Sequence, residues 1–180
     1  KTEERYKDSL LLVTGDHGEE FHEHGGWFHS SSLMPVQTQV PLLIKWPEGT
    51  KAPSHSSASH LDLLPSVMDH LGISGHERLP GVSLLKPSSV ERTQMTFACN
   101  TGVSGVCMAW YRDGWTATFR WKNPWSHQPP KHVYLDDIID PMGKSVRLSE
   151  ESAWDSELKK RFPDAAARLF RTVELVPDAP

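Results

Sequence analysis

The sequence predicts an α/β fold in which a first part with mixed strands and helices is followed by a small antiparallel sheet with a covering helix. Residues 10–13 form an unbroken apolar run, which fits a strand buried on both faces of a parallel sheet. Apolar side chains recur at helical spacing over residues 59–71. Apolar and polar residues alternate over 115–121, which predicts a strand with one apolar face.

Length and charge limit the class of protein. The 180 residues allow one domain of ordinary size, or a core with a small appendage. With 23 acidic and 19 basic residues the formal net charge is -4, so we expect no nucleic-acid partner. We also expect this polypeptide to be soluble, because no apolar stretch approaches the roughly 20 residues that span a bilayer, and no signal peptide pattern opens the sequence.

The chain turns polar directly after its first apolar run. Eight acidic or histidine residues fall within fourteen positions: Asp16, His17, Glu19, Glu20, His22, Glu23, His24 and His29. Loops at the carboxyl ends of strands are where open α/β sheets bind their ligands. In such a loop the carboxylate of Asp16 and the imidazole of His17 can converge on one cation. We interpret the loop as a metal site, and the alternative is a solvated polar surface.

Three ordered segments carry a family resemblance. TGDHGEEFHEHG is followed by His29 and QTQVPLLIKWP, then by SHLDLLPSVMDHLGI, and then by GVSLL. This order resembles the carboxyl-terminal half of the alkaline phosphatase and sulfatase superfamily. The resemblance implies that residues 1–88 are the carboxyl-terminal part of an alkaline-phosphatase-like catalytic core containing the metal loop. Residues 89–180 would then form a small α+β subdomain.

The resemblance also implies roles for individual residues. Asp16 and His17 match the pair that binds the catalytic metal, and His29 matches the position of a basic group that approaches the ester oxygens. When protonated, His29 could stabilise an anionic group or donate a proton to the leaving oxygen. The family's nucleophile and its further acidic ligands match nothing in this sequence, so we expect them upstream in the remainder of the catalytic domain, and expect this segment to be inactive alone.

The ligand types bear on the identity of the metal. Imidazole favours zinc or manganese, whereas calcium prefers oxygen ligands. His17 stands where calcium-dependent sulfatases commonly have Asn, so we expect zinc or manganese rather than calcium, with a lean towards phosphate esters. The substrate class is a sulfate or phosphate ester.

The secondary elements expected elsewhere are scaffold. Ser59 and Asp62 predict a helix start with a capping box, and Gly72 ends that helix. A meander is expected over 94–100, 106–112 and 115–121, with an Asp-Gly turn at 113–114. Residues 132–137 predict a further strand, and 156–173 a covering helix that Pro163 kinks or restarts. Cys99 and Cys107 could pair across a hairpin, or remain free buried thiols.

Two classes of function remain open. The first is a metal-dependent hydrolase or transferase, resembling membrane-anchored, periplasm-facing proteins such as sulfatases and phosphoethanolamine transferases. The second is a non-catalytic sulfatase-like domain that binds membrane lipid or protein partners. In both, the resemblance implies that the full-length protein lies at the extracytoplasmic face of the inner membrane.

Overall fold

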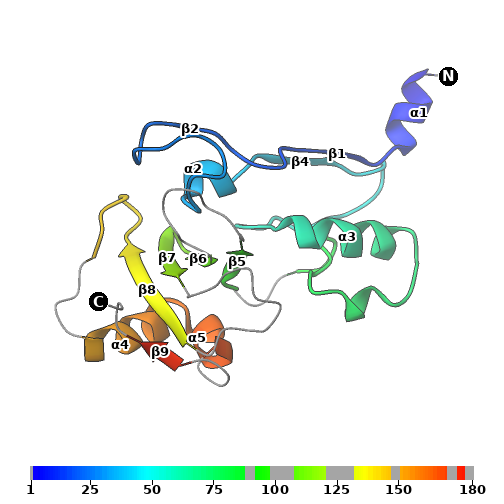
Figure 1. Cartoon of the computed structure of the whole chain (residues 1–180). Coiled ribbons are helices and arrows are strands. Elements are labelled where there is room, and N and C mark those ends of the chain that lie inside the picture. Colours follow the sequence, from blue (N-terminus) through cyan, green and yellow to red (C-terminus); the bar gives the residue numbers. More distant parts are fainter. Residues whose placement is uncertain are drawn as a thin grey trace. The chain divides into compact units, whose positions relative to one another are not determined.

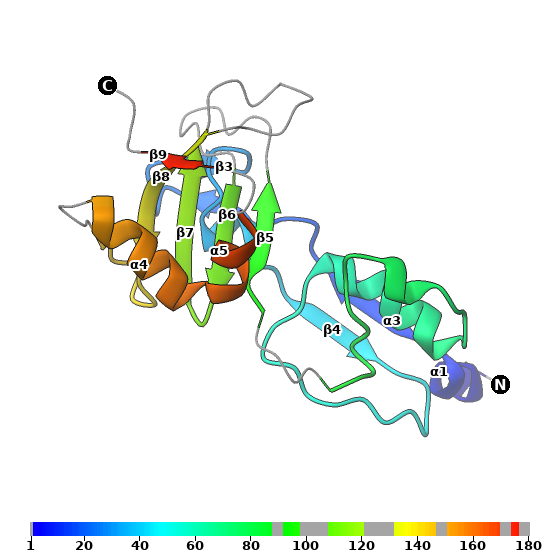
Figure 2. The same ribbon diagram turned by 90° about the horizontal axis from the view of Figure 1, so that it is seen from below.

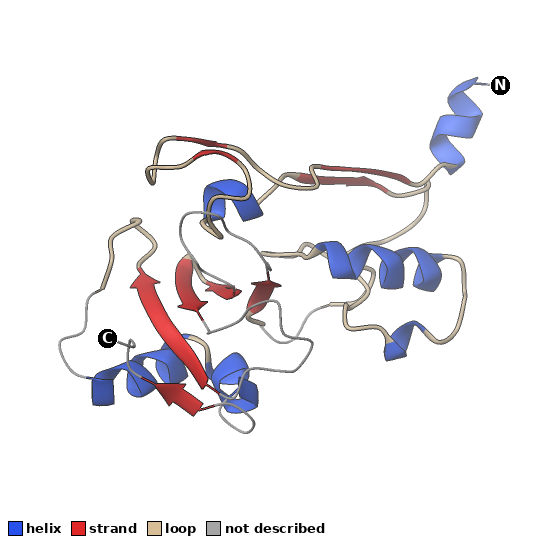
Figure 3. Cartoon of the chain, viewed as in Figure 1, coloured by secondary structure: helices blue, strands red, loops and turns tan. Residues whose placement is uncertain are grey.

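The computed structural model of the chain describes residues 2–87, 92–97, 108–120, 132–146, 151–169 and 174–176. These residues mix helices and sheets, which confirms the predicted α/β class (Figure 1 and Figure 3). The chain forms two compact units. The first comprises Lys1–Gly15 and Pro41–Glu91, and the second comprises Asp16–Val40 and Arg92–Pro180.

The first unit contains a two-stranded antiparallel sheet. Strand β1 (Leu11–Thr14), in the apolar run that predicted a strand, pairs with β4 (Leu42–Lys45). The expectation of a parallel strand buried on both faces is wrong for the part of the chain described, because Leu11, Val13 and Leu43 are exposed. An apolar run predicts a strand but does not specify its partner, and here the partner runs antiparallel.

Helix α1 (Thr2–Asp8) precedes β1 and is tied to β4 by one lysine. Lys45 Nζ donates hydrogen bonds to the carbonyl oxygens of Lys7 at 2.8 Å and Ser9 at 2.9 Å. The last carbonyls of a helix lack partners within the helix, and a lysine ammonium is well suited to satisfy them. Lys45 therefore fixes the end of α1 beside the sheet.

The predicted helix after Ser59 begins with a 3₁₀ turn (His60–Asp62) and continues as α3 (Leu63–His70). The predicted capping box is confirmed. The Ser59 hydroxyl accepts a hydrogen bond from the Leu61 backbone N–H, and the Asp62 carboxylate accepts one from the Ser59 backbone N–H at 2.8 Å. Asp62 is fully buried and also accepts from the Val82 N–H. A second 3₁₀ turn (His76–Arg78) follows.

The second unit is built on a sheet whose strands lie in sequence order (Figure 2). They are β5 (Gln94–Phe97), β6 (Met108–Arg112), β7 (Trp115–Arg120), β8 (His132–Ile139) and β9 (Glu174–Val176). All neighbours are antiparallel except β8 and β9. The predicted meander and the fourth strand are confirmed within the described ranges, while β9 was not predicted.

The turn between β6 and β7 has the expected chemistry. Asp113 and Gly114 have φ values of 51° and 79°. A two-residue type I′ turn needs positive φ at both central positions, and the Asp-Gly pair tolerates this conformation. The predicted turn therefore fixes the register of the hairpin.

Two helices cover one face of this sheet, as predicted. Helix α4 (Glu151–Arg161) ends just before Pro163, and α5 (Pro163–Leu169) restarts there. The ring centroids of Trp110 and Phe119 lie 4.5 Å apart, and those of Trp110 and Phe162 lie 5.9 Å apart. All three rings are fully buried, so they form the centre of the core.

The opposite face of the sheet is also buried, although the alternating sequence predicted a polar face. Leu33, from the polar loop, packs against Ala109 and Tyr111 of β6. The Tyr111 hydroxyl donates to the Leu33 carbonyl oxygen, and burial raises the pKa of Tyr111 to about 12, so the phenol stays a donor. The loop at 16–40 therefore belongs to the same compact unit as the sheet.

Several expectations fall outside the described residues. Cys99 and Cys107, for which pairing and free thiols were both left open, are among these. Within the residues described, no helix is long and apolar enough to cross a bilayer.

Replacing Phe162 with alanine tests the core. We expect Phe162→Ala to lower the free energy of unfolding by about 3–5 kcal/mol, because a buried aromatic ring is lost and a cavity remains. Urea denaturation of the chain measures this. Phe97→Ala is the matched control, since Phe97 is 64% exposed, and an equal loss in both variants would contradict the assigned core.

Candidate functional site

The polar loop folds back on itself as a short ribbon. Strand β2 (Glu20–Phe21) pairs antiparallel with β3 (Trp27–Phe28), and the short helix α2 (Pro35–Thr38) follows. Gly18 is tightly enclosed: a Cβ there would lie 2.1 Å from the Val36 carbonyl oxygen. Glycine is therefore required where the two ends of the loop meet.

A buried carboxylate organises this ribbon. Glu20 is fully buried, and its Oε1 accepts hydrogen bonds from the backbone N–H groups of His24 at 2.9 Å and Gly26 at 2.8 Å. Its Oε2 accepts from Gln37 Nε2 at 2.6 Å and from the Ser32 hydroxyl at 3.3 Å. Four donors from three segments of the loop thus converge on one side chain.

The hydrogen bonds outweigh the cost of burying the charge. Burial by itself would raise the pKa of Glu20, but the bonds from Gly26, Gln37, His24 and Ser32 hold that pKa below its usual value. A carboxylate that accepts several N–H bonds is stabilised in its ionised form. Glu20 is therefore an ionised structural anchor at neutral pH.

The backbone around this anchor adopts unusual conformations. His22, Phe28 and Ser30 have positive φ values of 78°, 66° and 63°. Side-chain-bearing residues seldom occupy this region, and a bulky residue such as Phe does so only when its surroundings require it. The Glu20 hydrogen bonds hold the turn between β2 and β3, which begins at His22, in place through the backbone N–H groups of His24 and Gly26.

Asp16 and His17 lie together at the beginning of the loop. His17 Nδ1 lies 3.0 Å from the Gly18 carbonyl oxygen, and His17 Nε2 lies 3.9 Å from Asp16 Oδ2. The Asp16 side chain is 93% exposed. Hydrogen bonding by its own backbone N–H, the charge of His17 and the His17 N–H lower the pKa of Asp16, so its carboxylate is ionised and available to a cation.

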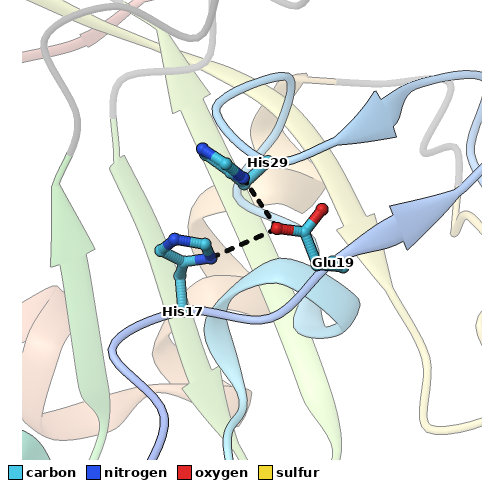
Figure 4. A group of neighbouring side chains, drawn as sticks. All are labelled: His17, Glu19 and His29. Atoms are coloured by element: carbon cyan, nitrogen blue, oxygen red, sulfur yellow. Dashed lines mark hydrogen bonds and ion pairs between the residues drawn. The ribbon is translucent and has the colours of Figure 1, made fainter.

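Glu19 joins His17 to His29 (Figure 4). Its Oε1 lies 2.7 Å from His29 Nδ1 and 3.7 Å from His17 Nδ1. The two imidazole rings are 4.1 Å apart at their centroids and tilted by 34°. One ligand atom from each of the three side chains lies within 4.8 Å of the others, so this group could itself hold a metal ion.

The structure thus brings together His17 and His29, and keeps Asp16 beside His17. Glu19 was counted in the loop but given no role, because its partner His29 is ten positions away in the sequence and only the fold brings the two together. His22 instead stacks on Trp27, with ring centroids 5.3 Å apart. The arrangement offers a cation-binding edge at Asp16 and His17, next to a histidine that can bind or protonate an anion.

Comparisons with known proteins match this chain to sulfatases. The sulfatase family model matches residues 1–73. A choline-sulfatase from Rhizobium meliloti is 36% identical over 142 residues, which cover 75% of this chain and 26% of the relative. An uncharacterized sulfatase from Escherichia coli is 32% identical over 84 residues, which cover 47% of this chain and 17% of the relative.

A solved structure shares the fold. The structure of a 2-O GAG sulfatase superposes with a TM-score of 0.58 at 16% sequence identity, covering 94% of this chain and 39% of the solved chain. The chain therefore spans well under half the length of the proteins that it matches. At this identity, the structural match concerns the fold alone.

Replacing Glu20 with glutamine tests the anchor. Glutamine offers one acceptor oxygen in place of two, so the backbone donors or Gln37 lose their partner. We expect Glu20→Gln to lower the free energy of unfolding by about 2 kcal/mol at pH 7. Faster amide hydrogen exchange at His24 and Gly26 would locate the damage, and unchanged exchange there would contradict the anchoring role.

The same side chain predicts a pH dependence. The pKa of Glu20 is lowered in the folded state. Glu20 therefore adds its full contribution to the free energy of unfolding above about pH 4.3, the pKa of an unperturbed Glu, and this contribution is lost as the pH falls through the lower pKa of the folded state. Urea denaturation should therefore show a smaller loss of stability on acidification for Glu20→Gln than for the wild type. Equal acid sensitivity of the two proteins would contradict an ionised Glu20.

Proposed function

We propose that this chain, which belongs to the sulfatase-like proteins of the alkaline phosphatase and sulfatase superfamily, contributes part of the active site of a metal-dependent hydrolase of sulfate esters. In this proposal Asp16 and His17 bind a divalent metal ion. His29 contacts the ester group. The observation that carries the proposal is the pairing of the Asp16 carboxylate with His17 Nε2.

The donor atoms fit a single cation. A metal-binding histidine usually donates its second ring N–H to a carbonyl or carboxylate, which fixes the ring and leaves the other nitrogen for the metal. The Gly18 carbonyl takes that place at His17 Nδ1 and leaves Nε2 towards Asp16. Two metal–ligand bonds of about 2.1 Å can join atoms up to about 4.2 Å apart, and the observed separation of 3.9 Å lies within that span.

The ligand types favour zinc or manganese over calcium, because imidazole suits the former and calcium prefers oxygen ligands. A divalent ion at this position would neutralise charge on an ester oxygen and lower the pKa of a coordinated hydroxyl group. The chain's own contribution is to hold the ion with an ionised carboxylate and a neutral imidazole.

His29 has a separate task. Its ring lies beside that of His17, with Nδ1 bound to Glu19. In the protonated state His29 can attract the anionic ester group, and it can donate a proton to the leaving oxygen. A proton donor next to a metal ligand is the arrangement that hydrolysis of a charged ester requires.

The proposal includes a limit on what these residues do alone. Asp16 and His17 supply two ligands, whereas a catalytic zinc normally has three from protein. The family's nucleophile matches no residue among these 180. We therefore propose that this polypeptide binds metal weakly and turns over no ester without the rest of a catalytic domain.

The substrate class follows from the relatives. One relative is named a choline-sulfatase, and the superposed structure is named a 2-O GAG sulfatase. We therefore favour sulfate esters as the substrate class, although the presence of His17 in the sequence had favoured phosphate esters. A location at the extracytoplasmic face of a membrane, in a membrane-anchored protein, is a further part of the proposal that rests on the resemblance alone.

Metal removal and substitution of Asp16 test the function. The protein that carries this sequence should contain zinc or manganese and should hydrolyse 4-nitrophenyl sulfate faster than 4-nitrophenyl phosphate. Chelation should abolish the activity, and Asp16→Ala should lower kcat/KM by about 100-fold or more, because loss of a metal ligand exceeds the 10- to 100-fold effects of residues behind the ligands.

Asp8→Ala is the control, since Asp8 is an exposed carboxylate at the end of α1. Activity that survives Asp16→Ala with the metal still bound would refute the ligand assignment. Absence of both metal and turnover would instead favour the second class of function, a non-catalytic domain that binds lipid or protein.

A further inference from the structure

We propose that Glu19 is a positioning residue, which fixes the proton of His29 on Nδ1 and so presents Nε2 of that ring as the atom that faces the ester. The inference rests on the proposed function for the identity of the ligand, an ester. The placement of the proton on one nitrogen of His29 does not rest on that function, because it concerns the chain without a ligand.

The first step is the chemistry of the two partners. An ionised carboxylate has only acceptor oxygens, so the group that it contacts has to donate. At 2.7 Å from Glu19 Oε1, His29 Nδ1 therefore carries a hydrogen. In a neutral imidazole one nitrogen is the donor and the other the acceptor, so Nε2 is then the acceptor. In the protonated ring Nε2 is a donor with its hydrogen pointing away from Glu19.

The second step is the common orientation of two rings. Glu19 Oε1 also lies 3.7 Å from His17 Nδ1, so both imidazoles turn their Nδ1 atoms towards one carboxylate oxygen. This leaves the Nε2 atoms of both rings free of Glu19, and His17 Nε2 is the atom near Asp16. Figure 4 shows both rings facing one carboxylate oxygen of Glu19. Glu19 therefore holds His29 by a hydrogen bond and lies near His17, whose Nδ1 is bonded to the Gly18 carbonyl oxygen.

An alternative use of these side chains is a metal site made of His17, Glu19 and His29. The two uses differ at one atom. A His29 that binds the metal through Nδ1 would lose its Nδ1 hydrogen on binding, whereas a positioned proton donor keeps that hydrogen.

Nitrogen-15 NMR of the histidine rings decides between these uses. In the wild-type chain at pH 8, without metal, the His29 signals should show the hydrogen on Nδ1. In Glu19→Ala they should move to the form with hydrogen on Nε2, which imidazole prefers without a partner at Nδ1. In Glu19→Gln the amide oxygen still accepts, so the wild-type form should be kept. Glu48→Gln, at an exposed carboxylate that pairs with Lys7, is the control.

Folding is monitored by the amide signals of His24 and Gly26, which report the Glu20 anchor. A His29 hydrogen that stays on Nδ1 in Glu19→Ala, or that sits on Nε2 in the wild type, would overturn the proposal. So would a zinc titration in which His29 loses its Nδ1 hydrogen and Glu19→Gln abolishes binding, since Glu19 would then be a ligand.

Kinetics of the protein that carries this sequence complete the test. Glu19→Ala should lower kcat about 10- to 100-fold with a smaller change in KM, and Glu19→Gln should recover part of the loss. A tautomer change in Glu19→Ala without any metal-dependent turnover in the wild type would support the positioning of His29 and refute the proposed function. The two inferences can therefore fail separately.

Discussion

The ribbon that carries the candidate site depends on burial of one negative charge. A carboxylate taken out of water is costly unless hydrogen-bond donors replace the lost hydration. Glu20 obtains these donors from the backbone of the turn between β2 and β3 and from the side chains of Gln37 and Ser32. The loop can therefore lower its free energy only by closing around Glu20, and this closure sets its path.

Closure around Glu20 has two consequences for the site. Successive residues of an extended segment point to opposite sides, so burying Glu20 directs its neighbour Glu19 outward, where Glu19 meets His17 and His29. It also presents Leu33 to the sheet, where Leu33 packs on Tyr111. The same interaction therefore holds the loop against the sheet and arranges the exposed side chains of the candidate site.

Much of the scaffold could be predicted from the sequence, because local chemistry decides it. The Asp113–Gly114 turn, the capping box at Ser59 and the restart of the helix at Pro163 each follow from residues close together in the chain. Those features require no knowledge of a distant partner. The resemblance to sulfatases likewise rested on local strings, and the family match confirmed it.

What could not be predicted depends on partners distant in the sequence. The hydrophobic pattern of β1 indicates a strand, yet its exposure and its antiparallel pairing depend on β4. The polar alternation of β7 suggests a solvated face, but Thr116 and Thr118 are buried. In the loop, Glu19 and Glu20 are chemically identical neighbours, and only the closed ribbon makes one an anchor and the other a partner of histidines.

The exposure of the site defines what this loop contributes. Asp16 is almost fully exposed and His17, Glu19 and His29 are about half exposed, so water screens the attractions among them. These side chains contribute mainly through their fixed positions. Because the buried Glu20 already orders the backbone that carries them, a ligand that binds there would not need to order it. Preorganised groups act most strongly where water is excluded. In the proposed function the loop would therefore supply orientation, and groups that bury these atoms would supply the strength of binding.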